Sequence, residues 1–442
     1  MKVSANNRIL MLLENQPYPQ DHRVRREATA LAAAGYRVSI ICPSSGGQRW
    51  RETVDNVRVY RFWAPPPVNS FLGYLWEYGY STAACFALSL LVFFGEGFDA
   101  VHAHNPPETL VFIGAFYKLF GKRFVFDHHD LSPEMYRARF PGGGSAIVYN
   151  ALIWLEKLTC LIADHVIATN ESYKKVEIER DRVPEERITI VRNGVEVRRD
   201  RRIKPDPELR KKANTIIGFV GVMGFQDGVD YLLRALHHLL HDLGRRDFYC
   251  ILMGDGDAWA SLKTLARQLC LEEYVCFTGP VHGAKLLRYL SAADICVDPD
   301  PANAYNDRST MIKMMEYMAL EKPIVAFDLP EHRVTAQQAA VYVTPNDERA
   351  FAAALAELMD DAARRKAMGA FGRHRIETKL AWQYSVPFLL EAYRKILPQY
   401  SVPDRAIVAD ERKLYSPASV STPTARAPHI SLTSGEQPSP RF

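Results

Sequence analysis

Histidines and carboxylates gather directly after two apolar runs of strand length in the first half of the chain. The run "DAVHA" leads into "HAHNPPE", and the run "RFVFD" leads into "DHHDLSPE". Ligands of parallel α/β sheets bind at the carboxyl ends of the strands, so these side chains are expected at a binding edge. The candidate site residues in these two segments are His104, Asn105, His128, His129 and Glu134.

A third polar segment, "QDHRVRRE", follows the first apolar run and adds Asp21 and Arg23 to the candidate site residues. Arginines in such a segment are more often solvated helix cations than ligands. None of the three segments has the spacing of a Ser-His-Asp triad or of the HExxH zinc motif. A metal site built from the histidines therefore ranks low.

The segment "NDRSTMIKMMEYMALEKPIVAFD", residues 306–328, reads as a helix followed by a strand. Asp307 or Ser309 is expected to cap a helix that runs to about Ala319. Ser309, Lys313 and Glu316 are four and three residues apart, so they would share one helix face. A diphosphate could bind at the helix N-terminus beside Lys313, with Glu316 accepting hydrogen bonds from a ribose. An ordinary amphipathic helix with an ion pair is the structural alternative.

Two glycine-rich turns in the second half are further candidates for a phosphate site. "GFVGVMG" places Gly221 and Gly224 after a strand, and "MGDGD" places Gly254 after the next one. Glycine lets the backbone approach phosphate oxygens closely, although any tight turn uses glycine as well. The residues expected to contact a donor are Gly221, Gly224, Gly254, Arg308, Ser309, Thr310, Lys313 and Glu316.

Strands that alternate with helices must position these residues, and the sequence shows this alternation twice. In the first half, strand-length runs lie at Arg8–Leu13, Arg37–Cys42, Asp99–Ala103, Arg123–Asp127, His165–Thr169 and Ile188–Val191. In the second half they lie at Thr215–Gly224, Phe248–Met253, Val275–Thr278, Ile295–Asp298 and Ile324–Phe327. This pattern predicts an α/β protein with two Rossmann-like, doubly wound parallel-sheet domains.

The composition changes twice along the chain, and these changes predict the domain boundaries. Residues 196–212 are strongly charged and contain two prolines, which is typical of a linker. They separate a first domain at 1–195 from a second domain at 213–379. Residues 401–442 are rich in Pro, Ser and Thr without periodicity, and we expect them to be disordered.

The net charge and the cysteine content indicate which ligands and which cell compartment to expect. The net charge of +4 over 442 residues gives no indication of nucleic-acid binding. Seven cysteines occur without a CxxC pair, which favours buried thiols in a reducing compartment. The first apolar run, Ile9–Leu13, is too short for a signal peptide. We therefore expect a cytoplasmic protein.

One apolar segment, Ser81–Phe94, is a candidate for contact with a membrane. It is shorter than the roughly 20 apolar residues of a spanning helix, and the aromatic residues Tyr74, Trp76, Tyr78 and Tyr80 precede it. A helix packed in the core or on a sheet face is slightly favoured. The alternative is a helix that contacts a membrane surface through residues 71–94, which would make the protein peripheral at the inner face of the plasma membrane.

The ordered set of motifs resembles the family-4 retaining glycosyltransferases, which have the GT-B fold. The resemblance runs from about Arg8 to Leu397 and is carried by "DHRVRREATALAAAGYRVSII", "DAVHAHNPPETL", "ADHVIATNES", "ITIVRNGVE", "GVDYLLRAL", "LMGDGD", "VCFTGPV", "ADICVDP" and "KMMEYMALEKPIVAFD". It implies two domains facing a central cleft, with an acceptor bound by the domain at 1–195 and a nucleotide sugar bound by the domain at 213–379. The candidates on the acceptor side are then Asp21, Arg23, Asn105 and Glu134. It also implies that residues 380–400 form a helix that returns to the first domain.

The resemblance implies transfer of a sugar from a nucleotide diphosphate sugar, UDP- or GDP-linked, to a glycan or lipid-linked acceptor. The transfer would retain the anomeric configuration and serve polysaccharide or glycolipid synthesis. Glu316 matches the glutamate that binds the donor ribose, and His129 best matches the histidine near the transferred sugar. His104 and His128 are its rivals. Members of the family need no metal at the active centre, so we expect neither a cofactor nor a metal there.

Three positions depart from the family pattern. The usual arginine and lysine that hold the diphosphate are replaced by Val222 and Asp227, and a usual second glutamate is replaced by Arg308. We therefore expect Arg308 and Lys313 to neutralise the diphosphate instead. The competing interpretations are a nucleotide-sugar 2-epimerase, which needs no acceptor, and an inactive paralogue that scaffolds a glycan-assembly complex.

Overall fold

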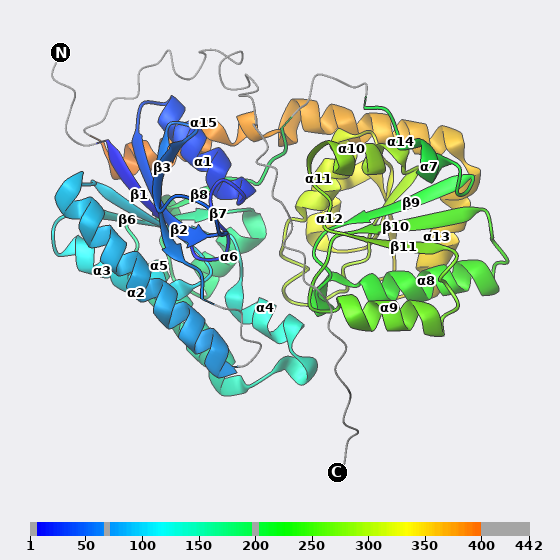
Figure 1. The fold of residues 1–442 in the computed structure, drawn as a ribbon, viewed down its shortest axis with the longest axis horizontal. Helices are drawn as coiled ribbons and strands as arrows, with labels where there is room; N and C mark the ends of the chain where they lie inside the picture. The colour runs from blue at the N-terminus through cyan, green and yellow to red at the C-terminus, as the bar shows by residue number, and fades with distance from the viewer. Residues whose placement is uncertain (1–6, 66–70, 197–202, 399–442) are drawn as a thin grey trace, which may run out of the picture.

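The computed structural model describes residues 7–65, 71–196 and 203–398, and these form two α/β domains, each built on one sheet (Figure 1). The first sheet has the strand order β3-β4-β2-β1-β5-β6-β7-β8. All its neighbouring strands are parallel except β3 and β4. Its strands are β1 (Arg8–Leu12), β2 (Arg37–Ser44), β3 (Arg51–Val54), β4 (Val57–Trp63), β5 (Ala100–His104), β6 (Arg123–His128), β7 (His165–Ala168) and β8 (Ile188–Ile190).

The second sheet is parallel throughout and has the order β11-β10-β9-β12-β13-β14. Its strands are β9 (Thr215–Val220), β10 (Phe248–Met253), β11 (Val275–Gly279), β12 (Ile295–Asp298), β13 (Ile324–Phe327) and β14 (Ala340–Val343). The strands of both sheets are short and largely buried, as expected for sheets covered on both faces. The predicted fold class is therefore confirmed.

Helices cover both faces of the first sheet. They are α1 (His22–Ala33), α2 (Phe71–Gly95), α3 (Val111–Lys118), α4 (Ser132–Arg139), α5 (Ala146–Ile162) and α6 (Glu171–Glu179). The Asp21 side chain caps α1 by accepting from the Val24 amide, and the Asn170 side chain caps α6 by accepting from the Tyr173 amide. Both helices therefore begin on the carboxyl side of a strand, α1 after β1 and α6 after β7, at the edge where the polar loops lie.

The helices of the second domain begin in the charged segment expected as a linker. They are α7 (Pro207–Arg210), α8 (Val229–His241), α9 (Trp259–Gln268), α10 (Gly283–Ala292), α11 (Ile312–Ala319), α12 (Pro330–Ala336), α13 (Glu348–Asp360) and α14 (Ala362–Arg375). The single turn of α7 lies within 196–212, of which 197–202 lie outside the described residues. The predicted disordered tail, 401–442, lies outside them too.

The predicted N-terminus of α11 is wrong. The helix begins at Ile312 behind Met311, with no side-chain cap, instead of behind Asp307 or Ser309. Residues 305–309 instead form turns, in which the amides of Arg308 and Ser309 both donate to the Tyr305 carbonyl. Lys313 therefore lies in the first turn of the helix, and Ser309 lies outside it.

The last helix, α15 (Val386–Ile396), packs against the first domain. Leu389 and Tyr393 belong to the same core cluster as Ile9 and Val38 of the first sheet. A hydrogen bond of 2.9 Å joins the Tyr393 hydroxyl to Nδ1 of His102 at the sheet. The end of the chain therefore closes one face of the first domain.

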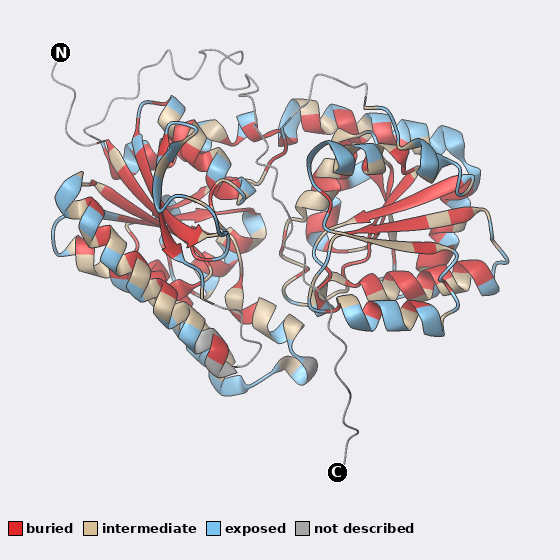
Figure 2. Cartoon of the chain, viewed as in Figure 1, coloured by how far each residue is buried: buried red, intermediate tan, exposed pale blue. Residues whose placement is uncertain are grey.

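Helix α2 is longer and more exposed than the sequence suggested. It runs over 25 residues, and its stretch Trp76–Gly95 is the one helical segment of the described chain long and apolar enough to cross a membrane. One side packs on the sheet through Cys85 and Val92, which agrees with the favoured expectation. Only 22% of the stretch is buried, however, so its outer side is apolar and exposed (Figure 2).

Candidate active site at the domain interface

Loops at the carboxyl ends of both sheets contact one another across the domain interface. The Tyr305 hydroxyl, beyond β12, donates to Asp130, beyond β6, at 3.1 Å. The Asn170 amide, beyond β7, donates to the Thr310 hydroxyl at 2.9 Å and to the Arg308 carbonyl at 2.8 Å. Because ligands of parallel sheets bind at these ends, the interface is where a shared site is expected.

Arg23 is the centre of a buried polar cluster on the acceptor side, and it is no solvated helix cation. Its side chain is 5% exposed and binds both carboxylate oxygens of Asp127 at 2.8 Å. It also donates to the Val191 carbonyl and to the Asn193 side chain. This bidentate pair fixes the Asp127 carboxylate at the end of β6, where its charge acts on the neighbouring histidines.

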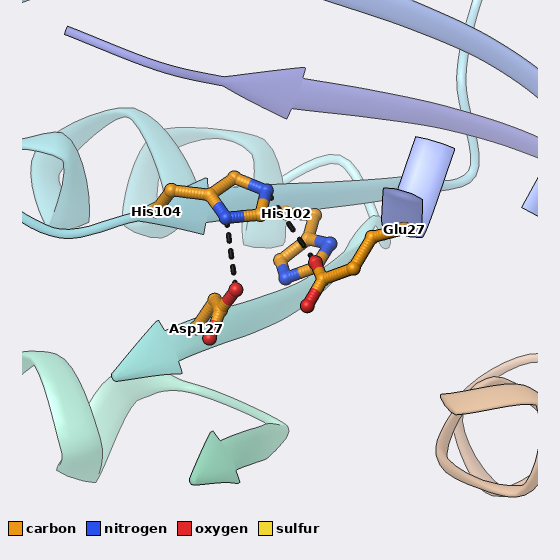
Figure 3. Close-up of side chains that lie close together, drawn as sticks. All are labelled: Glu27, His102, His104 and Asp127. Atoms are coloured by element: carbon orange, nitrogen blue, oxygen red, sulfur yellow. Dashed lines mark ion pairs between the residues drawn. The ribbon is translucent and has the colours of Figure 1, made fainter. Parts of the chain in front are cut away.

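Besides Arg23 and Asp127, this cluster contains one further carboxyl group and two imidazoles. Figure 3 shows Glu27, His102 and His104 pointing toward one another and toward Asp127. Nδ1 of His104 lies 2.9 Å from Asp127, and Nε2 lies 4.0 Å from Glu27. Burial raises the pKa of Glu27 well above its usual range, so this carboxyl holds a proton. Burial also lowers the pKa of His102 and of His104, so both rings are neutral.

His129 differs from its two rivals because it keeps some contact with solvent. Its side chain is 14% exposed, whereas those of His104 and His128 are fully buried. Its Nδ1 lies 3.8 Å from Asp127. Burial opposes a charge on the ring, but the Asp127 carboxylate outweighs it and raises the pKa of His129. Of the three candidates, His129 can therefore present a cation to a substrate.

His128 points the other way, into a second buried ionic cluster. Its Nδ1 and Nε2 lie 3.1 Å from Glu177 and 3.3 Å from Glu156, and these carboxylates raise its pKa well above the usual range against the effect of burial. Arg180 binds Glu156 and Glu134 in the same cluster. Glu134, expected near the acceptor, therefore has its carboxylate engaged by Arg180.

Asn105 shapes the loop that carries His129. Its side-chain oxygen accepts from the amides of His129 and Asp130, at 2.9 and 3.2 Å. Its side-chain nitrogen donates to Glu108 and to the Asp130 carbonyl. Asn105 is thus a buried positioning residue. Asp21 caps α1 with Oδ1 and is half-buried at the same edge.

Lys313 on the donor side is engaged by carboxylates. Its Nζ lies 2.6 Å from Asp300 and 3.1 Å from Asp298, and both aspartates are fully buried. These charges raise the pKa of Lys313, against the effect of burial. Lys313 is therefore a permanent cation whose charge is already opposed, unlike the free clamp that we expected.

Asp227 adds a third carboxylate near Lys313. It turns back onto its own loop, where it accepts from the Gly224 amide at 2.9 Å. Burial raises its pKa, and the charge of Lys313 opposes that rise. Asp227 thus occupies an amide that a phosphate oxygen could otherwise use.

Gly221 and Gly254 bring the two glycine turns into contact. The Gly221 amide donates to the Met253 carbonyl at 3.1 Å. A Cβ at Gly254, where φ is +137°, would lie 1.9 Å from the Gly221 carbonyl oxygen. Only glycine permits this approach, so Gly254 is required by the turn geometry itself.

The hydroxyls of two remaining donor candidates already have hydrogen-bond partners. The Ser309 hydroxyl bonds to the Tyr305 carbonyl and to the Tyr173 hydroxyl. The Thr310 hydroxyl bonds to the side chains of Asn170 and Glu331. Arg308 donates to the Ala304 carbonyl. Burial raises the pKa of Glu316, which the charge of Arg26 in the first domain opposes. Glu316 therefore faces α1 across the interface.

The sequence patterns did not predict Glu27, Asp298, Asp300 and His332. Asp298 ends β12 and Asp300 lies two residues further in "DICVDPD", so the tendency of polar residues at strand ends to form sites indicates both. Glu27 looks like an outward helix residue until Asp127, 100 positions further along the chain, is brought beside it by the fold.

Two family models match the chain, one in each domain. Residues 20–194 match the glycosyl transferase 4-like domain, and residues 214–361 match the glycosyl transferases group 1. The alpha-maltose-1-phosphate synthase of Mycolicibacterium smegmatis is 28% identical over 304 residues, which cover 63% of this chain and 74% of that protein.

Solved structures are similar over both domains. Sucrose-phosphate synthase from Thermosynechococcus elongatus aligns with a TM-score of 0.73 at 19% identity, covering 89% of this chain and all of that one. HepE from Anabaena in complex with UDP-glucose aligns with a TM-score of 0.65 at 16% identity, covering 88% of this chain and 99% of that one. At such identities the likeness concerns the fold, with two domains in the same arrangement.

Proposed function

Because the chain belongs to the family-4 glycosyltransferases of the GT-B fold, we propose that it transfers a sugar from a nucleotide diphosphate sugar to an acceptor hydroxyl with retention of configuration. The observation that supports this most is the meeting of two carboxyl-end edges, with His129 on one and Glu316 on the other. A donor between them would be touched by both domains. UDP- and GDP-linked sugars are both candidates, and HepE was solved with UDP-glucose.

In the proposed reaction, the bond between the anomeric carbon and the diphosphate oxygen breaks as the acceptor oxygen bonds to the same face of that carbon. The acceptor proton passes to the leaving diphosphate. His129, charged through Asp127, stabilises the negative charge that develops on the leaving diphosphate and orients the sugar. Arg23 holds Asp127 in place and thus acts on the substrate only through His129. The transfer itself needs no metal at the reacting carbon.

Glu316 is the proposed ribose ligand. Its side chain makes no hydrogen bond or ion pair with any described residue of the chain, so its oxygens remain free to accept from the ribose hydroxyls. The two glycine turns at Gly221 and Gly254 lie beside Lys313 and would approach the diphosphate.

A thermal-shift panel with UDP, GDP, ADP and their sugar conjugates tests the donor, first without metal and then with magnesium. A ligand that binds only the folded state raises the Tm by mass action, so one nucleotide family should raise it clearly. Incubating the preferred sugar nucleotide without acceptor then separates the proposal from a 2-epimerase, which would convert it. No shift with any nucleotide, together with no turnover, would favour the scaffold interpretation.

We further propose that the acceptor is lipid-linked and that the protein lies at the inner face of the plasma membrane. The outward residues Trp76, Leu91 and Phe94 of α2 are 61%, 46% and 81% exposed. Beside them, α2 and α3 line a groove of about 470 Å³ whose walls include Phe86 and Phe116. A surface of this kind binds a lipid interface with the helix lying flat on it, because the other side of α2 is docked on the sheet.

Helix α5 extends this apolar surface. Its residues Ile147, Trp154 and Leu161 are 82%, 60% and 72% exposed, and they recur at intervals of seven residues, which places them on one side of the helix. Since α3 contacts both α2 and α5, the three helices offer a membrane a broader apolar area than a single helix could.

Flotation with vesicles of phosphatidylglycerol and phosphatidylethanolamine tests this proposal. Leu91→Ser and Phe94→Ser should each weaken binding while the fold stays intact by circular dichroism. Phe93 is a poor probe because its ring packs on Phe98 and Tyr117. Leu243→Ser, on an exposed residue of the second domain, is the matched control. Equal flotation of all variants would contradict the proposal.

A further inference from the structure

The fully buried side chains of Asp298, Asp300 and His332 converge in the second domain, at the end of β12. Each offers a ligand atom, and these atoms lie within 4.8 Å of one another. Ligands at roughly 2.1 Å from one ion lie up to about 4 Å apart. A small rotation of the carboxylates is therefore enough to bring all three onto one ion.

His332 carries the strongest sign of a missing ligand. Its Nδ1 lies 2.9 Å from the Phe327 carbonyl oxygen, and because a carbonyl only accepts, Nδ1 carries the proton. In the neutral tautomer Nε2 offers a lone pair, and it lies 3.6 Å from Oδ2 of Asp298. Nε2 of His332 and both oxygens of Asp298 lack a hydrogen-bond partner among the described residues. A ring held by a carbonyl at one nitrogen and free at the other is the usual arrangement of a metal-ligating histidine.

The carboxyl groups of this pocket also favour a bound cation. Asp298 and Asp300 use Oδ1 for Lys313, at 3.1 and 2.6 Å, and leave Oδ2 of each without a hydrogen-bond partner. Asp227 acts on the same group of charges. One ammonium therefore faces three carboxyl groups, and a divalent cation beside Lys313 would favour their ionised forms.

The two other clusters of potential ligands lack this arrangement. In the cluster of Glu27, His102, His104 and Asp127, the guanidinium of Arg23 already contacts both carboxyl groups. In the cluster of His128, Cys160 and Asp181, both ring nitrogens of His128 face glutamates. The ligand atoms of these two clusters thus have other partners, whereas the pocket at Asp298 leaves one oxygen of each aspartate open.

We propose that Asp298, Asp300 and His332 bind a divalent transition-metal cation, zinc or manganese, which neutralises this pocket together with Lys313. An imidazole nitrogen with two carboxylates suits these ions better than calcium or magnesium, which prefer oxygen ligands alone. The ion is a resident of the donor domain and takes no part at the reacting carbon. The site does not depend on the proposed transfer reaction, since it is built from side chains of one domain.

Metal binding to the full chain tests the proposal. Protein stripped with a chelator is titrated with Zn²⁺ and with Mn²⁺ by calorimetry, and bound metal is counted after gel filtration. We expect one ion per chain, and a loss of affinity of about 100-fold or more in Asp300→Asn and His332→Gln. The control is His237→Gln with His241→Gln, because these two rings lie 4.4 Å apart on the surface of α8 and could capture zinc.

The outcomes separate clearly. Retention of the ion by the α8 variant and its loss from the pocket variants support the site. The opposite pattern, or no ion bound by the wild-type chain, overturns it. If the pocket variants fail to fold, X-ray absorption on the zinc- or cobalt-loaded wild-type chain decides instead. One imidazole with oxygen ligands supports the site, and two imidazoles or a sulfur ligand overturn it.

Discussion

Nδ1 of His129 lies 3.8 Å from Oδ1 of Asp127, whose two oxygens are held by the guanidinium of Arg23. The carboxylate is thus shared between a permanent cation, which fixes it, and a ring that can gain or lose a proton. Burial would raise the pKa of Asp127, but Arg23 and the neighbouring histidines hold it well below its usual range. Asp127 therefore stays negative and keeps His129 charged beyond the pH at which free imidazole loses its proton.

The first prediction concerns the pH dependence of transfer. Asp127→Asn removes the charge that raises the pKa of His129, so that pKa should fall. If the charged ring is the active form, the alkaline limb of the kcat/KM profile should move to lower pH. Measuring the profile of the wild type and the variant checks this. An unchanged alkaline limb would mean that another group controls it.

Glu27→Gln is the matched control for Asp127→Asn. Both replace a buried carboxyl of the same cluster by an amide, but Glu27 already holds a proton because burial raises its pKa. Its amide should therefore leave both the pH profile and the stability near neutral pH almost unchanged. A large effect of Glu27→Gln would show that its carboxyl is ionised in the folded protein.

The second prediction concerns turnover. His129→Ala removes the partly exposed cation of the acceptor side and should lower kcat by about 10²- to 10³-fold, which is typical for the loss of one charge-stabilising group. His374→Ala, on an exposed residue of α14, should leave kcat unchanged. Steady-state kinetics with the donor found by thermal shift measures both. Full turnover by His129→Ala would remove His129 from the mechanism.

Much of the scaffold could be predicted because buried parallel strands are short apolar runs. "HVIA" and "ICVD" are read directly from the sequence. The edge strand β3 and its neighbour β4 were not predicted, because "RETV" of β3 alternates charged with other residues and pairs antiparallel with β4 at the rim of the sheet. An edge strand needs no continuous apolar run, since one of its sides is open to solvent.

The site could be predicted only in part. The position of polar residues at strand ends predicted His129 as a site residue. It could not distinguish His129 from His104 and His128, because all three lie on or directly after a strand. Which ring meets solvent depends on α5 and α6, which cover His128 with Glu156 and Glu177. Likewise, Lys313 looked like a free cation because Asp298 and Asp300 belong to a different strand end.

The third prediction concerns stability. His128 has a raised pKa in the folded protein, so its charge stabilises the fold fully below about pH 6.5, and this contribution is lost as pH rises through the raised value. His128→Gln should lower the free energy of unfolding by about 3 kcal/mol or more near pH 7, because it leaves the buried side chains of Glu156 and Glu177 without their cationic partner. This deficit should shrink as the pH rises through the raised pKa, where the wild-type ring also loses its charge.

His165→Gln is the control for this pH dependence. His165 is also buried, but burial lowers its pKa to about 4, and Nε2 bonds to the Thr189 hydroxyl at 2.8 Å. The ring is therefore neutral throughout the alkaline range, and its replacement should cost the same at each pH. Urea unfolding of both variants at several pH values measures this. Parallel curves for the two variants would contradict a charged His128.

The fourth prediction concerns the contact between the glycine turns. Gly254→Ala places a Cβ 1.9 Å from the Gly221 carbonyl oxygen, so the turns must separate. Since both turns are expected to approach the diphosphate, nucleotide affinity should fall about tenfold or more, which corresponds to about 1.4 kcal/mol. Gly244→Ala is the matched control, because its φ is +66° but nothing lies within 4 Å of the added carbon. It should cost about 1 kcal/mol of stability through backbone strain alone and leave affinity unchanged.

Calorimetric titration of both variants with the nucleotide measures the affinities. Wild-type affinity in Gly254→Ala would place the diphosphate away from these turns.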